Sequence, residues 1–250
     1  MMVPADDGEG RLTFGQPDID ARLGNGLAQA ALHEVFAATE ADAAAAAAFA
    51  LLLALRCQRS GPLIWLQEGK AKTKGRLYGL GLSELGFDPA RLLLVQAPDT
   101  LSVLRAGADA VACGAVATVI IEPWGNATAC DLTATRRLAL ATTRSGVTTL
   151  LLRNGDPPPS AANSRWQIAA APSIALPANA PGMPAFDITL VRHRGGIAGF
   201  TTRLEWNRDR RAFVTPLPGH SPAIAAERTG ATREAAIRQR TPAPGKLRAA

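Results

Sequence analysis

Short apolar runs alternate with longer helix-forming segments over residues 32–152, and this alternation limits the fold more than any other feature of the sequence. It is typical of β–α–β crossovers, in which parallel strands pack against the helices that connect them. We therefore expect an α/β domain with a mostly parallel central sheet. The predicted strands are residues 32–36, 63–66, 89–95, 117–121 and 147–152, and the predicted helices are residues 43–59, 101–114 and 133–145.

The pattern changes after residue 154, where Pro157, Pro158 and Pro159 cannot take part in a strand ladder. Apolar and polar residues then alternate in residues 186–193 and again in residues 199–206, with two glycines between the segments. This pattern predicts a C-terminal antiparallel hairpin, residues 186–206. Trp166 and Ile168 indicate a further short strand. Trp206 is expected to lie in the core, on the same strand face as Phe200.

The net charge of +6 is unevenly distributed along the chain. Residues 1–191 hold 15 Lys and Arg against 17 Asp and Glu, whereas residues 192–250 hold 12 against 4. Large apolar residues become rare at the same end, and such a segment cannot bury enough surface to fold alone. We expect a flexible N-terminus (residues 1–10), one α/β domain (residues 11–219) and a basic, disordered tail (residues 220–250).

Composition also argues against several classes of protein. No apolar run approaches the roughly 18 residues of a membrane span, and the acidic start is unlike a secretory signal. We therefore expect a cytoplasmic protein without a membrane partner. Cys57, Cys113 and Cys130 are scattered, which predicts buried free thiols rather than a disulfide framework or a metal site. His33 is expected to be a hydrogen-bonded core residue, and no nucleophilic motif is visible.

The turn after the first predicted strand lacks the residues of a phosphate-binding loop. Such a loop uses glycines to direct backbone N–H groups at the phosphates, a Lys to reach them and a hydroxyl for the metal. Here there is no glycine and no lysine, and Glu40 and Asp42 introduce negative charge. We predict that no nucleotide or other cofactor binds. The degenerate loop consists of Ala37, Ala38, Thr39, Glu40, Ala41, Asp42, Ala43 and Ala44.

Two acidic residues, Glu68 and Glu122, follow predicted strands at the edge where a ligand would bind. If their carboxylates converge, they could act as a general base or hold a metal. The alternative is that each caps a turn or pairs with a basic neighbour such as Lys70. We favour the alternative, because phosphoryl transfer depends on positioning and nothing here would hold a triphosphate. Both residues are treated as vestigial candidates, with no catalytic residue predicted.

Basic residues concentrate in residues 69–76 and in residues 192–211, where aromatic residues lie among them. Arg and Lys can contact phosphates, and aromatic rings can stack on the bases of single-stranded DNA. A solvated surface would have the same composition, so both interpretations stay open. The candidate contacts to DNA or to a partner are Lys70, Lys72, Lys74, Arg76, Arg192, Arg194, Arg203, Arg208, Arg210 and Arg211.

The succession of segments over residues 11–212 resembles the RecA-type recombinase core and, within that superfamily, the ImuA family. Residues 19–27 are similar to the segment that precedes the phosphate loop in RecA proteins, and residues 32–36 stand at the strand before it. Residues 95–100 resemble the turn after the third RecA strand. Arg165-Trp166 and residues 204–208 resemble later signatures of the ImuA family itself.

The resemblance implies a RecA-like, P-loop NTPase-type fold in which Glu68 lies near the glutamate that orients the attacking water. Glu122 would stand at the position of the metal-associated aspartate. The ImuA family implies SOS-induced mutagenesis and repair of damaged DNA by error-prone translesion synthesis. The implied partners are an ImuB-like Y-family protein and a DnaE-type polymerase, with RecA and single-stranded DNA as further candidates.

Two other functions stay open from the sequence. One is a DNA-dependent ATPase of the RecA type with a degenerate site that uses Lys70 or Lys72 together with Glu68 and Glu122. The other is a cell-division inhibitor similar to SulA, whose fold is also RecA-like. The missing phosphate loop favours a non-catalytic adaptor, a pseudo-ATPase, over both.

Overall fold

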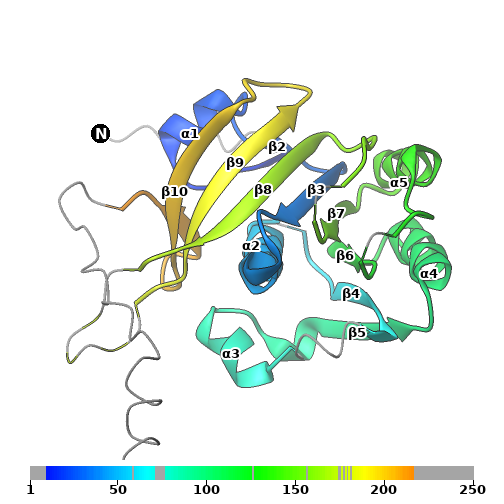
Figure 1. Cartoon of the computed structure of the whole chain (residues 1–250), viewed down its shortest axis with the longest axis horizontal. Helices are drawn as coiled ribbons and strands as arrows, with labels where there is room; N and C mark the ends of the chain where they lie inside the picture. The colour runs from blue at the N-terminus through cyan, green and yellow to red at the C-terminus, as the bar shows by residue number, and fades with distance from the viewer. Residues whose placement is uncertain are drawn as a thin grey trace, which may run out of the picture. The chain divides into compact units, whose positions relative to one another are not determined.

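A long twisted sheet forms the centre of the computed structural model, which describes residues 10–57, 59–70, 77–125, 127–155, 157–173, 176, 178, 180 and 182–216 (Figure 1). The strands are β1 (Arg11–Leu12), β2 (Leu27–Ala28), β3 (Leu32–Ala37), β4 (Leu63–Glu68), β5 (Leu92–Ala97), β6 (Thr118–Glu122), β7 (Thr148–Arg153), β8 (Ser164–Ala171), β9 (Ala185–His193), β10 (Phe200–Asn207) and β11 (Ala212–Val214). The α-helices are α1 (Pro17–Arg22), α2 (Ala43–Leu55), α3 (Gly79–Glu84), α4 (Thr100–Ala112) and α5 (Leu132–Ser145), and two 3-10 helices are η1 (Glu40–Asp42) and η3 (Pro89–Arg91).

The order of the large sheet is β11-β10-β9-β8-β3-β7-β6-β4-β5. All neighbours from β8 to β5 are parallel, whereas β8 to β11 pair antiparallel. The central strands β3 and β7 are buried along their whole length, as expected of parallel strands covered on both faces. The sequence prediction of an α/β domain with a mostly parallel sheet and a C-terminal antiparallel hairpin is confirmed.

Helices cover both faces of the sheet, with α2 on one side and α4 and α5 on the other (Figure 1). Apart from Phe49, α2 consists of alanine and leucine, which are among the best helix formers. A helix that is apolar all round is expected to be buried on several sides. Phe49 lies in a cluster of aromatic rings, with centroids 6.1 Å from Phe14 and Trp166 and 5.4 Å from Phe213.

Several predicted boundaries differ from the structure. The helix predicted to reach residue 59 ends at Leu55, and the Arg56 guanidinium then donates to the carbonyl and hydroxyl of Thr13 at 2.8 and 2.9 Å. The strand predicted from residue 89 begins at Leu92, because the Asp88 carboxylate caps η3 through Ala90 N–H. The short strand predicted at Trp166 is the eight-residue β8, which joins the parallel and antiparallel parts of the sheet.

Predictions for individual core residues are mostly confirmed. Trp206 and His33 are fully buried, and both His33 nitrogens are hydrogen-bonded. The prediction of three buried thiols was wrong: Cys130 is buried, but Cys57 is half-buried and Cys113 is exposed. Cys113 follows the last residue of α4, where the chain turns at the surface. All three cysteines are free.

The described residues all belong to one unit, Met1–His220, and residues 221–250 lie outside the described part of the chain. The predicted domain limits, residues 1–10, 11–219 and 220–250, therefore stay predictions. Among the described helices, none is long and apolar enough to cross a membrane. The described residues also contain no group of three His, Cys, Asp or Glu side chains arranged to hold a metal.

Candidate functional site

The connection between β3 and α2 occupies the place where a strand–loop–helix nucleotide site binds phosphates. After β3 ends at Ala37, the chain forms η1 and continues directly into α2. Ala38, Thr39 and Glu40 are exposed, and Ala43 and Ala44 begin the helix. The connection is thus a compact turn of helix, without the wide backbone curve in which successive N–H groups surround an anion.

The Asp42 carboxylate closes this turn. Its Oδ2 accepts hydrogen bonds from the Thr39 N–H at 3.1 Å and from the Thr39 hydroxyl at 2.7 Å, and its Oδ1 accepts from Ala170 N–H of β8 at 2.8 Å. The Thr39 hydroxyl is the main reason that the pKa of Asp42 lies below its usual value. The carboxylate therefore remains charged at neutral pH. This negative charge lies at the N-cap of α2, where the helix dipole would otherwise attract an anion.

Glu68 and Glu122 do not converge. They end neighbouring parallel strands, but side chains alternate between the faces of a sheet, and the two carboxylates take different partners. Glu68 Oε2 accepts from the Thr100 hydroxyl at 2.8 Å and from Trp124 N–H at 3.2 Å. This ties β4 to the start of α4 and to the turn after β6, on the face that carries α4.

Glu122 lies on the opposite face, which carries α2. Its Oε2 accepts from Trp65 Nε1 at 2.8 Å and from Gln67 Nε2 at 2.7 Å, both on β4. Burial raises the pKa of Glu122, although these two hydrogen bonds oppose the rise. With the acids on separate faces, the arrangement lacks the shared ligand position that general-base or metal chemistry would need. The prediction that Glu68 and Glu122 are vestigial candidates, with no catalytic residue, stays a prediction.

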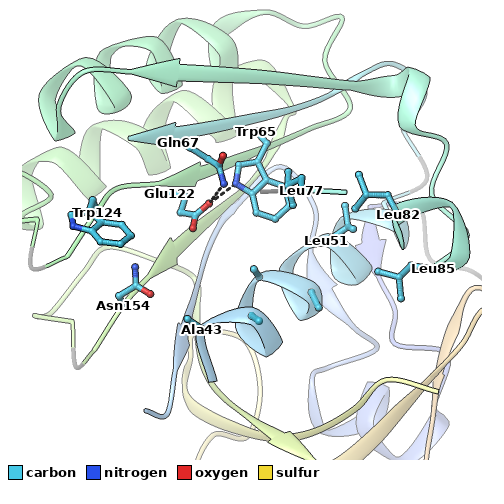
Figure 2. A pocket seen from close by; sticks show the side chains of 13 residues that line it. Ala43, Leu51, Trp65, Gln67, Leu77, Leu82, Leu85, Glu122, Trp124 and Asn154 are labelled. Carbon is cyan, nitrogen blue, oxygen red and sulfur yellow. Dashed lines mark hydrogen bonds between the residues drawn. The ribbon is translucent and has the colours of Figure 1, made fainter. Parts of the chain in front are cut away.

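Glu122 forms part of the wall of a cavity of about 250 Å³ between α2, α3 and the sheet (Figure 2). Small side chains on one face of α2 leave this space open, because alanine recurs there at helical spacing. The α2 wall consists of Ala43, Ala44, Ala47, Ala48 and Leu51. The other walls consist of Leu77, Leu82 and Leu85 at α3, Trp65 and Gln67 of β4, Glu122 and Trp124 at the end of β6, and Asn154 after β7.

The sequence prediction missed this cavity. The sequence pattern predicts only a buried strand at residues 63–66 and a helix after a degenerate loop at residues 43–59, and it does not reveal the space between them. The sequence does contain a signal, because the four alanines at positions 43, 44, 47 and 48 share one face of the helix. The partners of Glu122 could not be predicted, since Trp65 and Gln67 are more than 50 residues away in sequence.

The predicted basic surface is divided. Lys72, Lys74 and Arg76 lie outside the described residues, and Lys70 ends the described segment before them. Arg203 is held by Asp187 through two hydrogen bonds of 2.7 Å, and Arg192 donates to the Ser160 carbonyl at 2.8 Å. Both guanidinium groups are thus engaged within the fold.

The remaining predicted arginines lie at opposite ends of β10. Arg194 is exposed in the turn before β10, whereas Arg208, Arg210 and Arg211 are exposed in the turn after it. Eight residues of strand separate the two turns, which corresponds to about 27 Å. The described arginines therefore do not form one continuous DNA-binding strip across this hairpin.

Arg165, which is part of the Arg165-Trp166 motif, holds neighbouring segments of the fold together. Its Nε lies 2.5 Å from Oε2 of the fully buried Glu34, and its Nη2 donates to the Pro157 carbonyl at 2.8 Å. The Ser160 hydroxyl donates to the same Glu34 oxygen at 2.9 Å. These contacts join β3, β8 and the proline-containing loop between β7 and β8.

Comparison with known proteins shows one similarity in sequence and one in fold, although no protein-family model matches the chain. The chain is 37% identical over 205 residues to protein ImuA from two strains of Caulobacter vibrioides, an alignment that covers 75% of this chain and 80% of the relative. The crystal structure of the RadB recombinase superposes with a TM-score of 0.55 at 14% identity, covering 82% of this chain and all of that one. The fold is therefore RecA-like, and the sequence identity over four fifths of the relative shows that this chain belongs to the ImuA family.

Proposed function

We propose that this protein is a non-catalytic, RecA-like accessory protein of damage-induced, error-prone translesion DNA synthesis. Membership of the ImuA family supports a role related to SOS mutagenesis. The RecA-like fold supplies a large, ordered surface for other proteins, and we infer that it is retained for binding. Its work is to bring other components of mutagenic synthesis together.

The observation that carries the non-catalytic part of the proposal is the Asp42 carboxylate at the start of α2. It accepts three hydrogen bonds from protein groups in the place where phosphates would need such donors. Catalysis of phosphoryl transfer rests mainly on positioning and on compensation of the phosphate charge. A carboxylate in this place repels a triphosphate, and the divergence of Glu68 from Glu122 removes a common position for water and metal.

The proposed partners are an ImuB-like Y-family protein and a DnaE-type polymerase, with RecA as a further partner. This part rests on the resemblance to the ImuA family. Direct contact with single-stranded DNA is assigned to the arginines in the turn after β10, namely Arg208, Arg210 and Arg211. Of these, Arg208 has an acidic neighbour, Asp209, 3.7 Å away, which weakens its attraction for phosphate.

A reconstitution experiment tests the proposal. The full chain is tagged and mixed with the ImuB-like protein, the DnaE-type polymerase and RecA, with and without single-stranded DNA. We expect a stable complex without ATP, and damage-induced mutation that persists in cells carrying Glu68→Gln and Glu122→Gln. ATP hydrolysis stimulated by DNA and lost in Glu122→Gln would favour an ATPase instead. Overexpression that filaments cells while leaving mutation unchanged would favour a division inhibitor.

A further inference from the structure

The cavity between α2, α3 and the sheet has an apolar body and one negatively charged end. Alanine methyl groups, leucine side chains and the Trp65 indole form most of its surface, and its polar lining comes from Gln67, Glu122 and Asn154. None of the described residues that line it carries a basic side chain. The Glu122 carboxylate is therefore the one charged group in the described wall.

One oxygen of Glu122 is used by the protein and the other faces the cavity. The hydrogen bonds from Trp65 and Gln67 both go to Oε2. Figure 2 shows the second oxygen on the far side of the carboxylate, directed toward the space between Asn154 and Ala43. Within the described part of the chain, no hydrogen bond reaches this oxygen and no cation pairs with the carboxylate.

The two donors to Glu122 are neutral, so they orient the carboxylate without compensating its charge. Placing a charged group in a partly desolvated site is costly unless an opposite charge or further donors accompany it. A ligand with a positive N–H group at one end and an apolar body would supply what the wall lacks. An anionic ligand would be repelled, and a purely apolar one would leave the second oxygen without a donor.

We propose that this cavity is a binding site for a small amphipathic amine, in which an aromatic or branched aliphatic body contacts α2 and α3 and a primary ammonium group donates to Glu122 Oε1. The volume of about 250 Å³ suits a ligand smaller than drug-sized molecules, whose pockets span roughly 300–1,000 Å³. In this assignment Glu122 is a recognition residue. The site does not depend on the accessory role proposed above, and a protein that failed that test could still bind the amine.

The test uses three probes with the same phenyl body and different ends: 2-phenylethylamine, 2-phenylethanol and phenylacetate. They are titrated into the ¹⁵N-labelled full chain, and the indole N–H signal of Trp65 reports on its hydrogen bond with Glu122. We expect the amine to bind more tightly than the alcohol, and the acid to bind least. Equal affinities for the amine and the acid, or no change at Trp65 with millimolar amine, would overturn the proposal.

Two variants locate the site. Glu122→Gln keeps an acceptor for Trp65 and Gln67 but removes the charge, so the amine should bind at least tenfold more weakly and lose its advantage over the alcohol. Ala47→Leu fills the cavity and should abolish binding of all three probes, whereas Ala108→Leu on the exposed face of α4 should change nothing. Undiminished amine binding by either Glu122→Gln or Ala47→Leu contradicts the site. If Glu122→Gln does not fold, the order of affinities of the three probes for the unmodified chain still tests the proposal.

Discussion

Acidification should destabilise this fold through His33 in β3. The imidazole is fully buried, with Nδ1 2.7 Å from the Ser164 hydroxyl oxygen and Nε2 2.8 Å from the Ala28 carbonyl oxygen. Burial lowers the pKa of His33 from 6.5 to about 4; the hydrogen bond with Ala28 opposes this shift, and the positive charge of His193 adds to it. The neutral imidazole is therefore the form that the folded protein keeps.

The sign of the effect follows from proton linkage. The unfolded chain takes up a proton on this histidine near pH 6.5, whereas the folded chain does so near pH 4. The contribution to stability is complete above pH 6.5 and is lost as the pH falls to about 4. A difference of about 2.5 in pKa, at about 1.4 kcal/mol per pH unit, corresponds to about 3 kcal/mol.

Urea unfolding at several pH values between 7 and 4, on the unmodified protein and on His33→Gln, measures this effect. Glutamine is polar but does not titrate, and the carboxylates titrate in both proteins, so the difference between the two curves isolates the histidine. The stability advantage of the unmodified protein should shrink by about 3 kcal/mol over this range. Parallel curves, or a His33 pKa near 6.5 in an NMR titration of the folded protein, would refute the reasoning.

Three further predictions concern stability and are read from thermal or urea unfolding. Asp42→Ala removes the acceptor at the start of α2 and should lower the free energy of unfolding by about 1 kcal/mol. Glu40→Ala, two residues away, should lower it by less than about 0.5 kcal/mol. Trp206→Ala empties a fully buried position and should cost about 4 kcal/mol, whereas Ile197→Ala, at a side chain that is 66% exposed, should be nearly neutral. Gly107→Val should cost about 2 kcal/mol, because even a Cβ there would lie 2.7 Å from a β6 side chain. Equal losses within either pair, or a neutral Gly107→Val, would contradict the packing described.

The sequence was sufficient for the parts of the fold that depend on local patterns. The parallel strands appear as apolar runs. The caps of α4 and α5, in which Asp99 and Asp131 accept from the N–H groups of Ser102 and Ala134, are equally local, although no cap is predicted above. The hairpin of β9 and β10 follows from alternation and from its glycine-containing turn. Periodicity and capping are local, so one sequence reveals them.

The sequence was not sufficient where partners are distant. The Glu34 carboxylate binds Arg165, which is 131 residues away, and Trp206 donates to the Leu85 carbonyl, which is 121 residues away. Whether Glu68 and Glu122 share a ligand depends on which sheet face each occupies, and a shift of one residue in strand register would reverse the answer. The cavity beside α2 also depends on the position of α3, which no local pattern specifies.

Nucleotide binding by the purified full chain tests most directly whether this RecA-like fold is kept for binding proteins and not for hydrolysis. Isothermal titration with Mg-ATP and Mg-ADP, extended to millimolar nucleotide and with RecA as the positive control, measures it. The closed turn at Asp42 predicts no saturable heat for either nucleotide. Saturable binding of one nucleotide per chain, weakened by substitution of Asp42 or Ala43, would contradict the account.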